Sequence, residues 1–138
     1  IVLLRGEEML ENWLELQKFT KQVNTELERS LSQMVPAVTV NEFYVLHFLE
    51  QNAGHDLRVS DLSQKLDLSL SATSRMLVRF EQTCNVITRN QGQEDKRSVR
   101  INLTAEGENV LSEAKQRIDA VLSKYEEKLV NFGGIKND

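Results

Sequence analysis

The chain has 138 residues and a mass of 15.8 kDa, which is the size of one domain rather than of a multidomain enzyme. With 40% hydrophobic and 28% charged residues, one proline and six glycines, its composition is that of a folded protein rich in helix formers, which excludes general disorder. The formal net charge of -4 argues against nonspecific binding of polyanions by the chain as a whole. We therefore expect residues 1–138 to form a single domain.

The single cysteine and the N-terminal residues bear on localisation. Cys84 has no partner for an internal disulfide, which excludes a disulfide-stapled secreted scaffold and favours a reducing cytoplasm. The apolar run at residues 1–4 is too short for the core of a signal peptide or for a membrane span. We therefore expect a cytoplasmic protein that does not associate with membranes.

The first predicted elements are a long helix and a short central one. Apolar side chains recur three or four positions apart from residue 7 to residue 34, and Pro36 is expected to stop this helix. Such a stripe is longer than one small core can cover, so part of it is expected to contact a partner. Residues 40–50 are apolar on nearly all sides, which predicts a buried helix that ends in the turn at residues 52–54.

Two short helices joined by a tight turn are predicted next. Ser60 is expected to cap a helix over residues 61–66, and Asp67 lies in the turn, where it tolerates the left-handed conformation. Ser69 is expected to cap a second helix from Leu70 to about Thr83. This arrangement is the helix-turn-helix motif, whose second helix enters the major groove of DNA.

The second of these helices has two chemically different sides. Its predicted inward side, at helical spacing, consists of Thr73, Met76, Leu77 and Phe80. Its predicted outward side carries Ser71, Arg75 and Arg79. The two arginines lie one turn apart, so one is suited to donate two hydrogen bonds to a guanine edge while the other binds a phosphate. An ordinary solvated polar face is the alternative interpretation.

A β-hairpin and a long last helix complete the prediction. Residues 86–89 are β-branched, residues 90–97 are polar, and residues 99–103 alternate between apolar and polar, which predicts a hairpin, or wing, after the helix-turn-helix. Thr104 is expected to cap one continuous helix that runs to the glycines at residues 133–134. The predicted fold class is therefore mostly α with a small β wing: a winged helix-turn-helix between long terminal helices.

Charge is distributed unevenly along the chain. Residues 57–103 contain eight basic and five acidic side chains, whereas the rest of the chain contains nine basic and sixteen acidic ones. A basic middle flanked by acidic ends is expected when one module faces phosphates and the remainder does not. Residues 40–103 are therefore the predicted DNA-binding module, with double-stranded DNA as the partner.

The most specific pattern in the chain lies in the predicted wing and just after it, and it consists of Asp95, Arg97, Ser98, Val99, Ile101, Leu103, Thr104 and Gly107. These residues resemble the wing signature of the MarR/SlyA family of winged-helix transcriptional regulators, and the predicted helix-turn-helix resembles that of the same family. The resemblance covers almost the whole chain, although Asp67 and Asn85 stand where glycine is common in the family. It implies a sequence-specific transcriptional regulator, more often a repressor, which is released from DNA by a ligand.

The resemblance also implies a homodimer in which the terminal helices of two chains interlock. Residues 1–36 and 104–138 are then the dimerisation helices, and such a dimer reads a pseudo-palindromic site with half-sites about one helical turn apart. The expected interface residues are Trp13, Phe19, Ile118, Leu122, Tyr125 and Leu129. Relatives often bind small aromatic or phenolic compounds between the dimer stem and the winged module, where His47 is a candidate ligand-binding residue; a core histidine is the alternative.

The predicted DNA-binding residues come from both the second helix and the wing. They are Ser69, Ser71, Ser74, Arg75, Arg79, Asp95, Lys96 and Arg97. The three serines are suited to phosphate binding but are equally suited to capping alone. Arg97 is suited to insertion into a narrow minor groove, with Asp95 orienting its guanidinium and Lys96 at a phosphate. A surface turn with a weak ion pair is the alternative.

No motif points to catalysis or to a cofactor. The sequence has no P-loop, no nucleophile elbow and no dinucleotide-binding glycine pattern, so we expect neither an enzyme nor catalytic residues. His47 and His55 are not spaced as a metal-binding pair, so no metal site is expected, and Cys84 is interpreted as an inert, partly buried thiol. The remaining alternative function is a winged-helix module that binds protein without DNA, which would need aromatic anchors on its outward helix.

Overall fold

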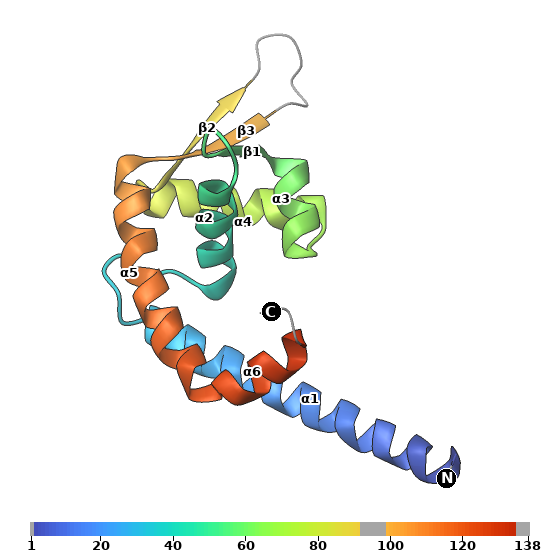
Figure 1. Cartoon of the computed structure of the whole chain (residues 1–138). Coiled ribbons are helices and arrows are strands. Elements are labelled where there is room, and N and C mark those ends of the chain that lie inside the picture. The colour runs from blue at the N-terminus through green and yellow to red at the C-terminus, as the bar shows by residue number, and fades with distance from the viewer. Residues whose placement is uncertain (1, 92–98, 135–138) are drawn as a thin grey trace.

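The structure is a computed structural model that describes residues 2–91 and 99–134 (Figure 1). It confirms a mostly helical fold with a small β wing. The elements in chain order are α1 (Val2–Leu31), α2 (Val40–Gln51), β1 (Asp56–Arg58), α3 (Val59–Leu66), α4 (Leu70–Thr83), β2 (Ile87–Gln91), β3 (Val99–Leu103), α5 (Ala105–Leu122), the 3-10 turn η1 (Ser123–Tyr125) and α6 (Glu126–Gly133). No helix in these two ranges is both long and apolar enough to cross a membrane.

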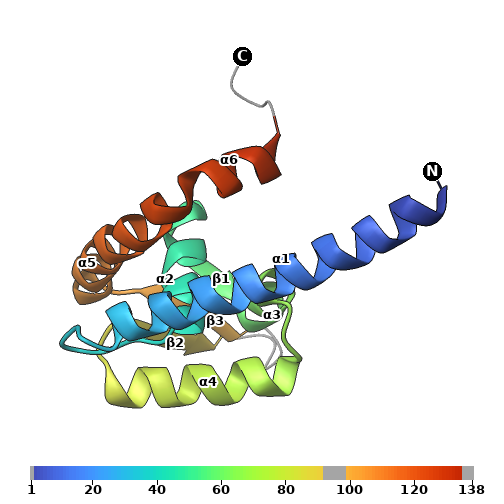
Figure 2. The same ribbon diagram turned by 90° about the horizontal axis from the view of Figure 1, so that it is seen from below.

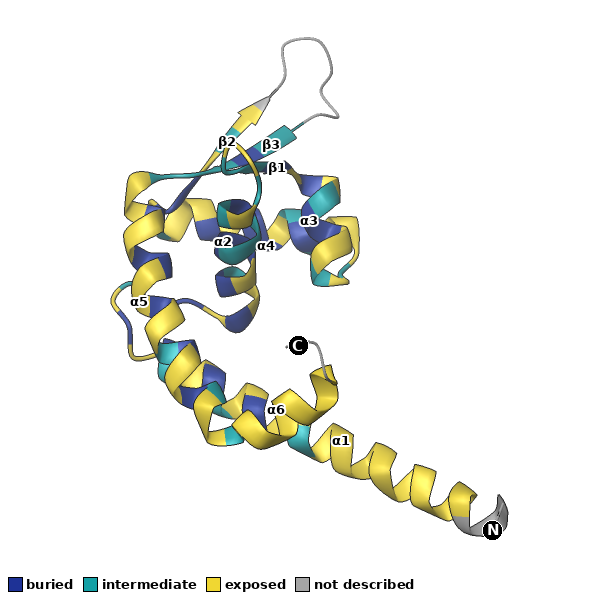
Figure 3. Cartoon of the chain, in the orientation of Figure 1, coloured by how far each residue is buried: buried dark blue, intermediate teal, exposed yellow. Residues whose placement is uncertain are grey.

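Only the C-terminal half of helix α1 packs against the rest of the chain. Its C-terminal part contributes Val23, Leu27 and Leu31 to the core, whereas residues 5–18 are exposed and project away from the other elements (Figures 1 and 3). The helix ends at Leu31, before the expected stop at Pro36, because a turn intervenes in which Met34 is buried. The apolar stripe of α1 is therefore only partly covered within one chain.

Helix α2 is the central helix that the sequence predicts. Thr39 caps it: the threonine hydroxyl accepts a hydrogen bond from the Glu42 amide at 3.1 Å, and the Glu42 carboxylate accepts one from the Thr39 amide at 2.8 Å. Val45, Leu46 and Leu49 are completely buried. One hydrophobic cluster joins α2 to the C-terminal part of α1, the helix-turn-helix, the sheet and α5, so the position of each element depends on α2.

The helix-turn-helix is confirmed, with one cap corrected. Ser60 does not cap α3; the helix begins at Val59 after Arg58, whose amide donates to the Asp61 carboxylate at 3.3 Å. The Arg58 guanidinium also donates to Asp61, which lowers the pKa of that carboxyl. Strand β1 ends at Arg58 and α3 begins directly after it, so Ser60 lies inside the helix and cannot cap it. Asp67 adopts the left-handed conformation, with φ 55° and ψ 45°, as expected for the turn.

The sheet has a third strand that the sequence analysis did not predict. Its order is β1-β3-β2, with both pairs antiparallel, and β1 pairs Leu57 with Ile101. Asp56 of β1 accepts a hydrogen bond from Arg100 of β3, with Nε and Oδ2 2.5 Å apart, and this contact lowers the pKa of the Asp56 carboxyl. Strand β1 thus fixes the base of the wing to the loop after α2.

The last helix is not continuous, so that prediction was wrong. Thr104 caps α5 as expected, since its hydroxyl accepts a hydrogen bond from the Gly107 amide at 2.9 Å. The chain then passes through η1 at residues 123–125 before α6 begins, and Tyr125 has left helical geometry at φ -117° and ψ 21°. Tyr125 packs edge-on against Phe19, with ring centroids 5.4 Å apart, and its hydroxyl donates to Glu26. These contacts with α1 stabilise the bend. The regular apolar spacing of the last helix gives no sign of it.

Candidate nucleic-acid interface and adjacent cavity

Helix α4 presents one side to the core and the other to solvent. Ser69 caps the helix as predicted, with its hydroxyl accepting from the Ala72 amide at 3.1 Å. The four residues of the predicted inward side are all buried. Figure 2 shows α4 along one edge of the molecule, on the side away from α5 and α6. The outward side chains are Ser71, Ser74, Arg75, Val78, Arg79 and Gln82.

Arg75 and Arg79 make this outward side positive. Both side chains are exposed, and neither pairs with a carboxylate within residues 2–91 and 99–134. The acidic residue of α4, Glu81, lies 3.4 Å from the Arg89 guanidinium on β2, which offsets its charge. Phe80 is the aromatic residue of α4 and it is fully buried, so the outward side offers no aromatic anchor. The side is therefore suited to a polyanion.

The three serines occupy different positions at the start of α4. The Ser69 hydroxyl serves as the cap, and the Ser71 hydroxyl lies 3.5 Å from it. Ser71 is exposed, whereas Ser74 is half-buried. The structure therefore gives Ser69 a defined capping role and leaves Ser71 on the outward face.

The wing flanks this face, but its tip is not described. Strands β2 and β3 pair from Ile87–Leu103 to Gln91–Val99. Asp95, Lys96 and Arg97 lie outside the described residues, so their proposed contacts with the minor groove stay predictions. At the base of the wing, Arg100 is paired with Asp56 and Arg89 faces Glu81. These two arginines are held by the fold.

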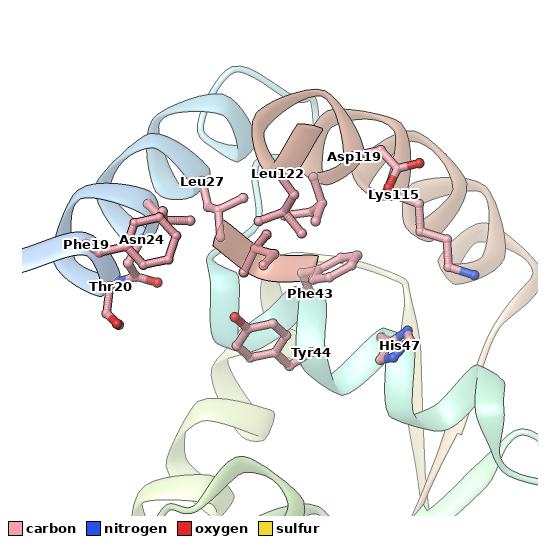
Figure 4. A pocket seen from close by; sticks show the side chains of 13 residues that line it. Phe19, Thr20, Asn24, Leu27, Phe43, Tyr44, His47, Lys115, Asp119 and Leu122 are labelled. Carbon is pink, nitrogen blue, oxygen red and sulfur yellow. The ribbon is translucent and has the colours of Figure 1, made fainter. Parts of the chain in front are cut away.

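A cavity of about 570 Å³ lies between the winged module and the terminal helices (Figure 4). Phe43, Tyr44 and His47 of α2 form one wall, and side chains of α1 and α5, with Leu129 of α6, form the others. His47 stacks on Phe43 with ring centroids 6.1 Å apart. Burial, and to a smaller degree the nearby Glu28 carboxylate, raise the pKa of the Tyr44 hydroxyl. The cavity is thus aromatic, with a few polar groups, and His47 lies where the sequence analysis placed it.

Comparison with known proteins identifies the module that carries this face. Residues 38–99 match the model of the MarR family; they include α2, β1, the helix-turn-helix and β2, and they end at the first residue of β3. Residues 38–99 form a MarR family domain. The Bacillus subtilis protein MdtR, an HTH-type transcriptional repressor, is 28% identical over 112 residues, which cover 81% of this chain and 69% of MdtR. The chain thus contains a MarR family domain and, over most of its length, is similar to a transcriptional repressor.

Solved structures share the MarR-type fold. Sco3205 from Streptomyces coelicolor, a MarR family transcriptional regulator solved in complex with DNA, is 20% identical with a TM-score of 0.77, over 85% of this chain and 72% of that one. NadR, solved in complex with 4-hydroxyphenylacetate, is 23% identical with a TM-score of 0.68, over 87% of this chain and 82% of that one. At these identities the likeness establishes the fold.

The residues expected at a dimer interface of this MarR-type chain separate into two groups. Phe19, Ile118, Leu122 and Tyr125 are wholly or partly buried against neighbouring helices of the same chain. Trp13 is 54% exposed and Leu129 is 37% exposed. Other exposed apolar residues of the same helices are Met9, Leu10, Leu14, Leu16, Val130 and Phe132. The uncovered part of the apolar stripe is thus on the N-terminal half of α1 and on α6.

The described residues provide no group of three side chains able to hold a metal ion. His55 approaches Glu108 at 3.3 Å and takes part in no larger cluster among these residues. Cys84 is half-buried at the end of α4, beside the Thr83 hydroxyl at 3.8 Å.

Sequence reasoning missed two outward residues of the MarR domain. Val78 and Gln82 lie on the same side of α4 as Ser71 and Arg75. Val78 lies seven positions after Ser71 and three after Arg75, and Gln82 lies eleven and seven positions after them, so helical spacing was available as a signal. Val78 is not predicted as an outward residue from its type, because valine is usually a core residue.

Proposed function

We propose that this regulator binds a pseudo-palindromic site in double-stranded DNA, with α4 in the major groove and the wing in the minor groove of each half-site. The observation that carries the proposal is the pair of exposed guanidinium groups, Arg75 and Arg79, on the outward side of the second helix of a helix-turn-helix. The DNA-bound structure of Sco3205, which has the same fold, supports this partner. We place the protein in the cytoplasm, together with its DNA.

The proposed regulator is a homodimer built on the uncovered apolar residues of α1 and α6. A single chain leaves Met9, Leu10, Trp13 and Leu14 each more than half exposed along one stretch of α1 (Figure 3). Contiguous apolar surface of this kind marks an interaction site, and a twofold axis lets the same surface of two chains cover itself. Such an axis places the two α4 helices on successive turns of the duplex.

The aromatic cavity is the proposed site of a small aromatic or phenolic effector. Its walls come from α2 of the winged module and from α1 and α5, so a bound molecule is wedged between the two parts whose relative position sets the spacing of the α4 helices. Phe43 offers a stacking surface, and Tyr44 and His47 offer polar groups. NadR in complex with 4-hydroxyphenylacetate supports a ligand of this class, and the similarity to the repressor MdtR supports a role in repression.

The DNA-binding proposal is tested by selection from random duplexes followed by a salt titration. We expect the full chain to enrich a sequence with inverted half-sites about ten base pairs apart. The logarithm of its binding constant should fall steeply and linearly with the logarithm of salt concentration, because lysines and arginines displace counterions from phosphates. Failure to retain any duplex at low salt would exclude the function.

Trp13→Glu tests the dimer. Placing a carboxylate in the apolar stripe of α1 is expected to weaken self-association by about tenfold or more, because the charge has to be desolvated in the interface. Sedimentation equilibrium over a concentration series measures the change. Asn12→Glu is the matched control, since it adds the same side chain on an exposed position one residue away. Equal self-association of Trp13→Glu and the wild type would contradict the α1 interface.

A further inference from the structure

We infer that Val78 determines part of the DNA specificity by contacting the 5-methyl group of a thymine in each half-site; this rests on the proposed DNA-binding function. Val78 is 37% exposed although it is apolar and lies on the second helix of the helix-turn-helix. It occupies the middle of the outward side, one turn after Ser74 and one turn before Gln82. Val78 therefore lies on the surface by which α4 would contact DNA.

The fold itself does not require a valine at this position. Four other residues of α4 already supply its buried side. A β-branched residue is a poorer helix former than alanine, lysine or arginine, so at an exposed helical position it slightly weakens the helix. The same branching leaves valine one strongly preferred rotamer in a helix. Val78 therefore holds its two methyl groups in a fixed direction, so its side chain loses little conformational entropy when it makes a contact.

The charges around Val78 indicate the kind of surface that covers it. Arg75 and Arg79 lie three positions before it and one position after it, and both are exposed. The carboxylate of Glu81, three positions on, is paired with Arg89. A valine between two exposed guanidinium groups, neither of which pairs with a carboxylate among the described residues, fits a polyanion that also presents an apolar group. In the major groove of DNA that apolar group is the thymine methyl, which an aliphatic side chain contacts.

Deoxyuridine substitution tests the contact, because it removes only the methyl group of a thymine. The duplex enriched in the selection experiment is synthesised with each thymine replaced in turn by deoxyuridine, in both half-sites, and binding is measured by fluorescence anisotropy. At one symmetric position we expect wild-type affinity to fall about fourfold for each methyl removed. Val78→Ala should bind the thymine and deoxyuridine duplexes equally. Val78→Thr, which keeps the branched shape, should show a reduced preference for thymine.

Val35→Ala provides the matched control. Val35 is 93% exposed in the turn after α1, and the same substitution there should leave the full preference for thymine. The inference is overturned if no thymine position is sensitive to deoxyuridine, or if Val78→Ala keeps the wild-type ratio at the sensitive position. If the wild type still enriches a specific duplex, either result overturns the thymine contact and leaves the DNA-binding function intact. If the wild type enriches no duplex, both the DNA-binding function and the thymine contact are excluded.

Discussion

Gly107→Ala is expected to lower the free energy of unfolding by about 3 kcal/mol, which is a large cost for the addition of one methyl group. A Cβ atom at Gly107 would lie 2.2 Å from the Val86 carbonyl oxygen and 2.7 Å from Cδ1 of Leu103. The Val86 carbonyl cannot simply retreat, because it accepts a hydrogen bond from the Thr104 amide at 3.1 Å. Either the first turn of α5 or the start of the wing has to move.

Urea denaturation measures this loss, and Gly6→Ala provides its control. Gly6 is also in a helix, but a Cβ there would meet nothing within 4 Å. Alanine at position 6 is expected to leave stability unchanged or to raise it by up to about 1 kcal/mol, because glycine is the poorer helix former. A Gly107→Ala protein as stable as the wild type would show that α5 and the wing do not pack as closely as the structure has them.

Arg75→Ala is expected to weaken binding to the selected operator on the order of 100-fold. A bidentate contact to guanine contributes roughly 1–3 kcal/mol of discrimination, and a dimer loses the contact in both half-sites. The loss should be largest at one base pair of each half-site, so that this position becomes less selective. Anisotropy measurements against operators with each base pair changed locate that position.

Two further variants separate base reading from charge. Arg75→Lys keeps the positive charge but loses the planar fork, so it should keep most of the salt dependence and still lose selectivity at the same base pair. Arg29→Ala removes an exposed arginine from α1 and should leave operator affinity close to that of the wild type. An Arg75→Ala protein with unchanged affinity and unchanged selectivity would exclude Arg75 from the groove.

The helix-turn-helix and its outward arginines were predictable because they depend on local signals. Ser69 and Thr104 cap the helices that follow them, and the spacing of apolar residues in α4 marked which side is buried. Arg75 and Arg79 then fell on the outward side by helical geometry alone. Val78 was equally predictable from its spacing, but its residue type indicates a core position, and only its exposure in the structure shows otherwise.

The features of the fold that escaped prediction involve partners distant in the sequence. Strand β1 has three residues, too few for a pattern of its own, and exists because it pairs with β3 more than 40 residues later. The bend at η1 depends on the contacts of Tyr125 with Phe19 and Glu26, about 100 positions earlier. The correction at Ser60 has the same origin, since β1 ends at Arg58 and α3 begins directly after it.

Local patterns in the chain predict which segments are helical, where most of the helices begin and which side of each is apolar, because these properties depend on side chains within one or two turns of each other. Long-range packing produces the third strand, the bend before α6, the close approach at Gly107 and the aromatic cavity beside His47. Each of these arises where residues far apart in the chain are brought together by burial of their apolar surfaces around α2, and no local pattern records which distant residues will meet.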